Sequence, residues 1–359
     1  MKNRKWSFFR AMTLQPGSRV LVTGASGFVA SHVVRALLRC GCHVRGTVRD
    51  PSDAYKVDAL RAIAAAEGAS DALELVRADL LDASSFTDIA TDCDAVAHTA
   101  SPFTFADITD VEAQLIAPAV EGTRSVVEAC RASASVKRLV VTSSFASVWN
   151  NIDAPQHVYT EDDWNFASTA EDGAFSAYMF SKRVAEEAAW EDVAKSGGAN
   201  PNLTIATICP PMVLGPVIHA PRTVRDLNTS AAMLHKYWSG AQTTMARGGN
   251  HWVDVRDVAD AHVAALGADA AAGKRFLVGG TWLNWHAMCA LIEADPAAAG
   301  GASLAVDIDA ALAAKDDAPF AISDAAARRD LAFMPRPINA TVRDACASFA
   351  ALQQQWEEA

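Results

Sequence analysis

The sequence predicts an α/β protein with a Rossmann-type, doubly wound parallel sheet and a smaller, mostly helical C-terminal substrate lobe. Three observations support this fold class. Short apolar runs alternate with helical patterns over residues 19–215. The runs are almost continuously apolar, as strands are when helices cover both faces of a parallel sheet. A glycine-rich turn joins the first run to the first helix, the place where such folds bind a dinucleotide.

The elements follow one another in a regular order. A strand over 19–24 (RVLVTG) leads into an amphipathic helix over 27–41, which Gly41 ends. Further strands are predicted at 43–49, 72–80, 94–101, 137–144, 204–215 and 275–280. Further helices are predicted at 53–66, 111–133, 175–196, 228–239 and 253–267. From residue 281 onward the chain is Ala-rich and mostly helical, with little strand.

This order divides the chain into a tail and two folded parts. Residues 1–16 are basic, have only a short apolar stretch (WSFF) and are predicted to form a loose tail. The Rossmann domain is predicted over 17–215 and 251–280. The substrate-binding lobe is predicted over 216–250 and 281–359, and it is expected to close over the ligand site.

Composition excludes several classes of function. The net charge is −11 and no Lys/Arg run is present, so nucleic acid is not an expected partner. No run of about 18 uncharged apolar residues occurs, so no membrane span is expected. Seven scattered Cys without a CxxC pair indicate reduced thiols in a cytoplasmic protein. The nine His are dispersed, and no metal is predicted.

The stretch VTGASGFVASHVV carries Gly24 and Gly27, with Ala30 in the third place. A strand-to-helix turn of this kind needs a residue that tolerates positive φ, and a side chain there would block a diphosphate. The N-terminus of the helix then offers free N–H groups to the anion. The predicted contacts of this turn with a dinucleotide are Thr23, Gly24, Ser26, Gly27, Phe28 and Val29.

The end of the second strand bears on the choice of dinucleotide. Arg49 offers a fork suited to a 2′-phosphate, whereas Asp50 is suited to ribose hydroxyls or to a turn. Lys56 adds a second cation, so NADP(H) is favoured and NAD(H) stays possible. Asp79 and Leu80 follow the third strand, where adenine would lie, and Ala100 and Ser101 follow the fourth, beside the diphosphate and ribose.

The stretch SAYMFSK sets Tyr178 and Lys182 four residues apart, as neighbours on one face of a helix. Two unit charges about 4 Å apart interact by about 4 kcal/mol at an effective dielectric of about 20. At about 1.4 kcal/mol per pKa unit, the ammonium would lower a tyrosine pKa from about 10 toward about 7, although desolvation opposes this. Ser143 and Ser144 end the fifth strand and point to opposite sides, so only one faces the site.

Together these motifs resemble the extended short-chain dehydrogenases/reductases. The stretches VLVTGASGFVASHVV, HVRGTVRD, SVKRLVVTSS, AYMFSK and CPPMVLGP resemble the dihydroflavonol reductase and cinnamoyl-CoA reductase branch, and within it the NADPH-dependent aldehyde/carbonyl reductases of the aldehyde reductase 2 type. The resemblance assigns catalysis to Ser144, Tyr178 and Lys182, and the 2′-phosphate to Arg49 and Lys56. It sets Pro210, Pro211 and Val213 against the nicotinamide.

The resemblance implies reduction of an aldehyde or ketone, with hydride from NADPH and the proton from Tyr178. A small-molecule carbonyl or alcohol is the expected partner, and the protein is expected to be a monomer or a homodimer. An NAD-dependent sugar-nucleotide epimerase or dehydratase and a non-catalytic NADP(H) sensor are the alternatives. Candidates for lining the substrate pocket, each of which could instead be core packing, are Phe103, Met212, Tyr237, Trp238 and Trp252.

Overall fold

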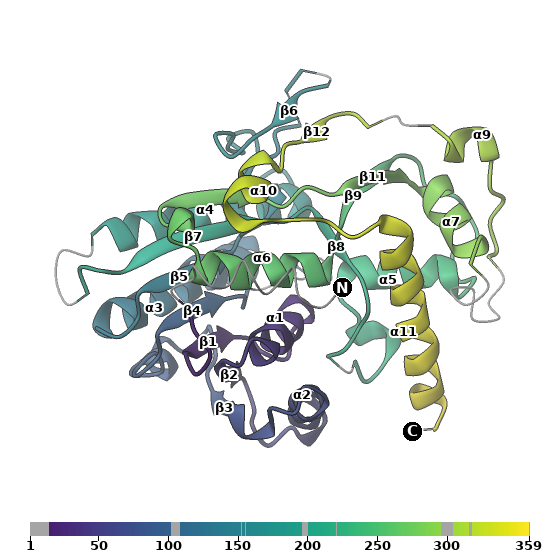
Figure 1. Ribbon diagram of the computed structural model, residues 1–359. Helices are drawn as coiled ribbons and strands as arrows, with labels where there is room; N and C mark the ends of the chain where they lie inside the picture. Colours follow the sequence, from purple (N-terminus) through teal and green to yellow (C-terminus); the bar gives the residue numbers. More distant parts are fainter. Residues whose placement is uncertain are drawn as a thin grey trace.

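A seven-stranded parallel sheet forms the centre of the protein in the computed structural model (Figure 1). The structure describes residues 14–101, 108–151, 153–154, 156–195, 200–219, 221–295, 304–315 and 318–358. The strand order is β10-β7-β5-β4-β1-β2-β3. The strands are β1 (Arg19–Thr23), β2 (His43–Val48), β3 (Leu73–Arg77), β4 (Ala95–His98), β5 (Arg138–Thr142), β7 (Thr204–Cys209) and β10 (Lys274–Leu277). The predicted doubly wound parallel sheet is therefore confirmed.

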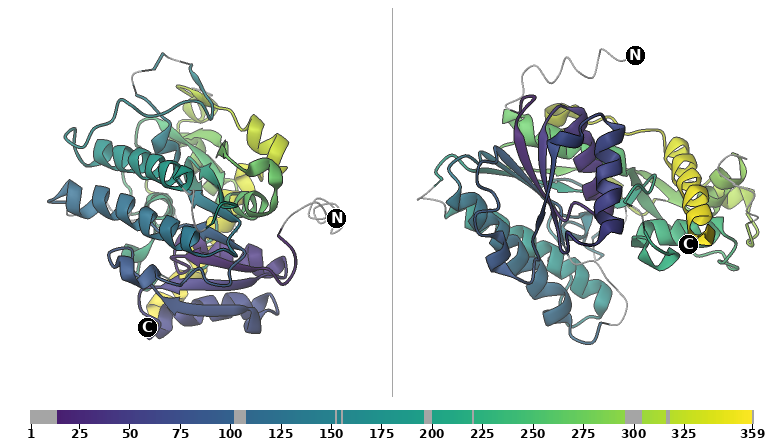
Figure 2. Two further views of the ribbon diagram at one scale, coloured as in Figure 1. Left: turned by 90° about the vertical axis from the view of Figure 1, so that its left-hand side faces the viewer. Right: turned by 90° about the horizontal axis from the view of Figure 1, so that it is seen from below.

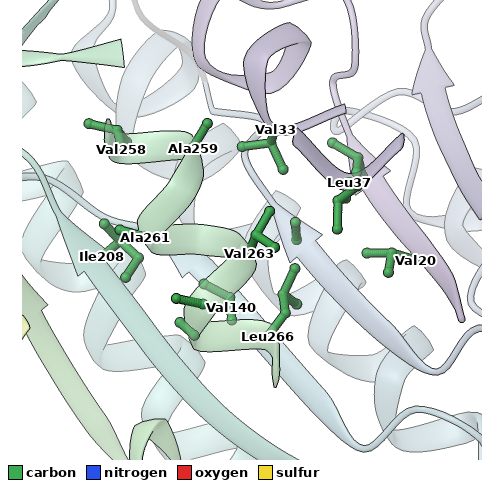
Figure 3. Close-up of a cluster of buried hydrophobic side chains, with 14 of the residues drawn as sticks. Val20, Val33, Leu37, Val140, Ile208, Val258, Ala259, Ala261, Val263 and Leu266 are labelled. Atoms are coloured by element: carbon green, nitrogen blue, oxygen red, sulfur yellow. The ribbon is translucent and has the colours of Figure 1, made fainter. Parts of the chain in front are cut away.

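Helices cover both faces of this sheet. One face carries α1 (Phe28–Arg39), α2 (Ala54–Ala66), α6 (Val255–Gly267) and α10 (Ala325–Leu331). Figure 3 shows α1 and α6 meeting through Val33, Leu37 and Val263 above the sheet residues Val20 and Val140. The other face carries α3 (Ala117–Ala132) and α4 (Ala174–Ala194), which run side by side (Figure 2). Alternation along β1 sends Val20 and Val22 to one core and Leu21 to the other.

The C-terminal lobe is built around a second, three-stranded sheet in the order β11-β9-β8. Its strands are β8 (Met212–Leu214), β9 (Gly249–Asp254) and β11 (Thr281–Asn284), and its helices are α5 (Thr229–Trp238), α7 (Trp285–Glu293), α9 (Ala310–Ala313) and α11 (Ile338–Glu358). A two-stranded ribbon pairs β6 (Val158–Tyr159) with β12 (Ala321–Ile322). Phe28 of α1 belongs to the hydrophobic core of this lobe, so the two parts pack together.

Several predicted elements have different bounds in the structure. The single strand predicted over 204–215 is two strands in different sheets, because Pro210 and Pro211 lack the N–H groups that would continue the ladder. The helix predicted over 253–267 begins at Val255, and Asp254 ends β9 and caps the helix by accepting from the Arg256 N–H. Short strands β6, β9, β11 and β12 have little period-two pattern and were not predicted. One π-helical turn, Glu112–Ile116, precedes α3 where a regular helix was expected.

The structure also bears on the N-terminal segment, the cysteines, membrane-spanning helices and metal sites. Most of the predicted loose tail lies outside the described residues, but Leu14 is buried in the core, so the end of this segment is packed. All seven cysteines are free thiols. Within the described ranges, no helix combines the length and the apolar character needed to span a bilayer. The same ranges hold no cluster of three His, Cys, Asp or Glu side chains suited to a metal ion. The division into domains stays a prediction.

Candidate active site

The glycine-rich turn between β1 and α1 has the shape that a diphosphate requires. Gly24 has a φ of +64°, and a Cβ there would lie 3.0 Å from the Cβ of Ala100. Gly27 begins α1, whose first turn has neither a side-chain cap nor an acidic residue, so its N–H groups are open to an anion. Ser26 and Val29 are half-buried beside them, and the Phe28 side chain is buried. These residues fit a dinucleotide diphosphate.

The Thr23 side chain bonds to the segment that follows β4 and does not face a ligand site. The hydroxyl is buried, lies 2.8 Å from His98 Nδ1, and accepts from the backbone N–H groups of Thr99 and Ala100, each at 3.1 Å. Ala100 and Ser101 are thereby held next to Gly24. The adjacency predicted for the ends of the first and fourth strands is therefore present.

The end of β2 presents a cation. Arg49 is exposed directly after the strand, and Lys56 is half-buried in the first turn of α2. Asp50 accepts from the backbone N–H and the hydroxyl of Ser52, at 2.8 and 2.6 Å, which makes it a turn residue. The carboxylate is used locally and Arg49 is exposed beside it, and the contact of Arg49 with a 2′-phosphate stays a prediction. The adjacent Asp53 pairs with Arg222 at 2.5 Å.

The residues after β3 make local turn and packing contacts, which do not identify a ligand site. Asp79 is half-buried and accepts from the Leu81 N–H at 3.0 Å, as a turn residue does. Leu80 packs against Gly122 of α3, where any Cβ would lie 2.9 Å from its side chain. Their assignment to the adenine stays a prediction.

The two serines that follow β5 differ in burial and in their partners. Ser143 is buried, and its hydroxyl donates to the Glu186 carboxylate at 2.6 Å. Ser144 is half-buried and caps the single turn Phe145–Ser147, accepting from the Ala146 N–H at 3.1 Å. Its contact with a substrate stays a prediction.

Tyr178 and Lys182 converge on this serine from α4. The Ser144 side chain interacts with the Tyr178 phenol, and this interaction lowers the pKa of the phenol. The Lys182 ammonium lies 5.5 Å from the centre of the Tyr178 ring, and its Nζ donates to the Ser101 hydroxyl at 2.5 Å. One helix thus brings the phenol and the ammonium to the carboxyl edge of the sheet, where Ser101 and Ser144 stand.

The electrostatics of Tyr178 differ from the sequence-based expectation. Burial raises the pKa of the Tyr178 phenol well above its usual value, and the interaction with Ser144 offsets this only in part. Burial also lowers the pKa of Lys182 to about 8. The expected lowering of the tyrosine pKa is therefore wrong for the protein without ligands, because desolvation has the largest effect on this phenol. The phenol keeps its proton at neutral pH, as a proton donor must.

The residues after β7 border the same site. The Pro210 carbonyl accepts from the Phe145 N–H at 2.9 Å, which ties this segment to the turn that carries Ser144. Pro211, Met212 and Val213 are half-buried, and the last two pack against the core of the C-terminal lobe. Contact of Pro210, Pro211 and Val213 with a nicotinamide stays a prediction.

Most of the predicted pocket residues have another role. Tyr237, Trp238 and Trp252 are at most 4% exposed and belong to the hydrophobic core of the C-terminal lobe. Tyr237 stacks on Trp285 with ring centres 4.8 Å apart, and Trp252 meets the same ring edge-on at 5.7 Å. These three are core residues, and their large rings fill the interior of the C-terminal lobe. Phe103 lies outside the described residues.

Two features of the site were not predicted. One is the hydrogen bond between Lys182 and Ser101, which no local spacing indicates. The other is Glu186, one helical turn beyond Lys182, which is buried and paired with Arg275. A signal for Glu186 was present, since four residues separate it from Lys182 as four separate Lys182 from Tyr178.

A glycine-rich turn, an exposed arginine after the second strand and a Ser–Tyr–Lys group at the carboxyl edge define the class of dinucleotide-dependent oxidoreductases. The model of the NAD dependent epimerase/dehydratase family matches residues 20–279. Cinnamoyl-CoA reductase CAD2 of Medicago truncatula is 41% identical over 268 residues, which cover 73% of this chain and 76% of that protein. The chain belongs to the NAD dependent epimerase/dehydratase family, which confirms the predicted resemblance to extended short-chain dehydrogenases/reductases.

Solved structures agree with this assignment. The yeast methylglyoxal/isovaleraldehyde reductase Gre2, complexed with NADPH, superposes with a TM-score of 0.80 and is 26% identical, covering 94% of this chain and 99% of that one. Gre2 of Candida albicans in complex with NADPH gives a TM-score of 0.78 at 28% identity, covering 93% and 99%. The similarity extends over the C-terminal lobe, which the family model matches only in part.

We expect Arg49→Ala to weaken NADPH binding about tenfold or more and to leave NADH binding unchanged, since a charge-assisted bond to a phosphate contributes about 1.5–3 kcal/mol. Fluorescence titration of both coenzymes measures this selectivity. Arg61→Ala is the matched control, because Arg61 lies on the exposed side of α2 and pairs only with Asp58, at 3.2 Å, among described residues. An equal loss of affinity for both coenzymes would remove Arg49 from the 2′-phosphate site.

Proposed function

We propose that this chain reduces an aldehyde or ketone to the corresponding alcohol with NADPH, and that Tyr178 donates the proton. The observation that carries the proposal is the convergence of three side chains, in which Ser144 interacts with the Tyr178 phenol and the Lys182 ammonium lies 5.5 Å from the centre of the same ring. All three side chains stand at the carboxyl edge of the sheet next to the glycine-rich turn, the position at which this fold binds its dinucleotide.

Each residue has a distinct role in this proposal. When bound, the nicotinamide supplies the hydride that the carbonyl carbon accepts. Ser144 donates a hydrogen bond to the carbonyl oxygen and polarises it, and Tyr178 transfers its proton to the same oxygen. Lys182 then stabilises the phenolate that this transfer leaves behind. Gly24, Gly27 and the N-terminus of α1 would hold the diphosphate, and Arg49 the 2′-phosphate.

The comparisons favour a reductase over the alternatives. The relatives described above are reductases by name, and both solved structures contain NADPH. Sugar-nucleotide epimerases use NAD, and the exposed Arg49 beside an internally bonded Asp50 is better suited to NADPH. A sensor without catalysis is disfavoured because the Ser144 side chain interacts with the Tyr178 phenol, beside which the Lys182 ammonium lies. We propose an aldehyde or a ketone as the class of substrate.

The proposal also covers the substrate lobe, the cellular compartment and the oligomeric state. The C-terminal lobe, with α5, α7 and α11 around its own core, is the proposed substrate lobe. Seven free thiols, of which six are buried, support a reducing compartment such as the cytosol. The chain is proposed to act as a monomer or a homodimer.

The function is tested by incubating the purified chain with NADPH and a panel of aromatic and aliphatic aldehydes and ketones. We expect the absorbance of the reduced nicotinamide to fall in proportion to the alcohol formed, and NADH to support slower turnover. A sugar-nucleotide epimerase would convert its substrate without net oxidation of the coenzyme, and a sensor would bind NADPH without turnover. Either result would overturn the proposal.

A further inference from the structure

A buried carboxylate lies on α4, one turn after Lys182, and takes no part in the proposed proton transfer. Glu186 is 1% exposed and follows Lys182 by one turn of α4. Its Oε2 accepts from the hydroxyls of Ser143 and Ser147, at 2.6 and 2.7 Å. Its Oε1 accepts from the Thr207 hydroxyl at 2.7 Å. A buried ion with this many short hydrogen bonds is held in one orientation.

Arg275 of β10 balances the charge of this carboxylate. Its Nε lies 2.8 Å from Glu186 Oε1, and both side chains are almost fully buried. Burial by itself would raise the pKa of Glu186, but Arg275 and the serine hydroxyls outweigh it and lower the pKa below its usual value. The guanidinium also donates to the carbonyls of Glu161 and Asp163, each at 2.8 Å, and lies 3.6 Å from the centre of the Trp164 ring. The carboxylate is thus ionised at neutral pH and is held by a buried ion pair and several hydrogen bonds.

The same carboxylate fixes the turn that carries Ser144. Two of its three hydroxyl donors belong to this turn or lie beside it, since Ser147 is the last residue of the single turn over 145–147 and Ser143 precedes Ser144, which caps it. The Ser147 hydroxyl also lies 2.8 Å from the Ser144 carbonyl oxygen. On the opposite side, Asn165 donates to the Ala146 carbonyl at 3.0 Å through its amide and to the Ser147 carbonyl at 2.9 Å through its backbone N–H. The turn is therefore held by two sets of hydrogen bonds, one to Glu186 and one to Asn165.

These contacts join the two elements whose separation sets the reaction geometry. Ser144 follows β5 by two residues, and Tyr178 belongs to α4, eight residues before Glu186 on the same helix. A misplacement of about 1 Å between reacting groups can reduce a rate about a hundredfold. A helix-borne carboxylate bonded to the neighbours of Ser144 prevents such a shift.

Resting on the proposed function, we propose that Glu186 is a positioning residue, which fixes the Ser144 turn against α4 so that the Ser144 and Tyr178 hydroxyls meet the same carbonyl oxygen. Arg275 keeps this carboxylate ionised and in place. The role differs from general stabilisation of the fold, because it acts on the chemical step through one identified side chain.

The proposal is tested with Glu186→Gln in the full-length chain, alone and combined with Ser144→Ala. We expect Glu186→Gln to lower kcat for aldehyde reduction about tenfold to a hundredfold, while NADPH affinity in fluorescence titration stays within about threefold. Glu187→Gln is the matched control on the same helix, because Glu187 is partly exposed and pairs with Arg183 outside this network. The control is expected to retain wild-type kcat.

The double-variant cycle separates positioning from a structural role. If Glu186 acts through Ser144, Glu186→Gln costs less than about threefold in kcat when Ser144 is already alanine. An equal fold-loss in both backgrounds, or an unchanged kcat in the single variant, would overturn the proposal. If Glu186→Gln does not fold in thermal unfolding, Ser143→Ala replaces it in the same cycle, because it removes one hydrogen bond and leaves the ion pair intact. Wild-type turnover of the aldehyde is measured first, so that a failure of the proposed function is recognised separately.

Discussion

Replacing Tyr178 with phenylalanine is expected to lower kcat for carbonyl reduction about a thousandfold, within the range of about 10²–10⁴ attributed to general acid–base catalysis. The substitution removes one oxygen and leaves the ring in contact with Lys182. Because burial raises the pKa of Tyr178, the wild-type phenol is protonated over the whole working range, and its loss removes the proton donor at every pH. Steady-state kinetics with NADPH and a reactive aldehyde measure the effect.

The Tyr178→Phe variant should still bind NADPH with wild-type affinity, since the residues proposed for the diphosphate and the 2′-phosphate lie on other elements. Tyr55→Phe is the matched control: Tyr55 is 37% exposed, and within the described residues its hydroxyl donates to the Pro221 carbonyl at 3.1 Å. Full turnover by Tyr178→Phe would refute the proposed mechanism, whereas loss of NADPH binding would indicate a structural role for the phenol.

Lys182→Met is expected to lower kcat about a hundredfold. Two unit charges about 5.5 Å apart attract each other by about 3 kcal/mol at an effective dielectric of about 20, and this attraction stabilises the phenolate as the proton leaves. The variant also loses the hydrogen bond to Ser101. The exposed residue Lys236 provides a matched control, Lys236→Met, for the loss of a positive charge.

The pH dependence of kcat tests the same residue in the wild-type protein. Burial lowers the pKa of Lys182 to about 8, so its positive charge is present below that pH and is lost as the pH rises through it. Reduction should therefore be fastest on the acid side and fall on the alkaline side of about pH 8. In Lys182→Met this alkaline decline should disappear, leaving a low rate that is flat from about pH 6 to about pH 10. A variant that keeps the decline would assign it to another group.

Much of the fold was predictable because its signals are local. The almost continuous apolar runs of β1, β4, β5 and β7 indicate strands buried on both faces, and the glycine-rich turn marks the start of α1. The strand bounds failed where the local pattern is weak, as at β9, or where two prolines divide an apolar run between two sheets. Pairing partners decide such cases, and they lie far away in the sequence.

The candidate site shows the same division. The i, i+4 spacing of Tyr178 and Lys182 follows from the geometry of one helix. The roles of Tyr237, Trp238 and Trp252 were not decided by their type, because an aromatic ring suits a pocket and a core equally well. Only the packing of α5, α7 and α11 around them places these rings in a core.

The sequence alone determined the doubly wound sheet, the glycine-rich turn and the order of Ser144, Tyr178 and Lys182, because periodicity and spacing within one element are properties of the chain itself. Only the tertiary structure decided which way the pKa of Tyr178 moves, because burial depends on segments distant in sequence. It also decided the partner of Glu186, since 89 residues separate it from Arg275. Desolvation and ion pairing arise between elements, and they become visible only when the elements are packed.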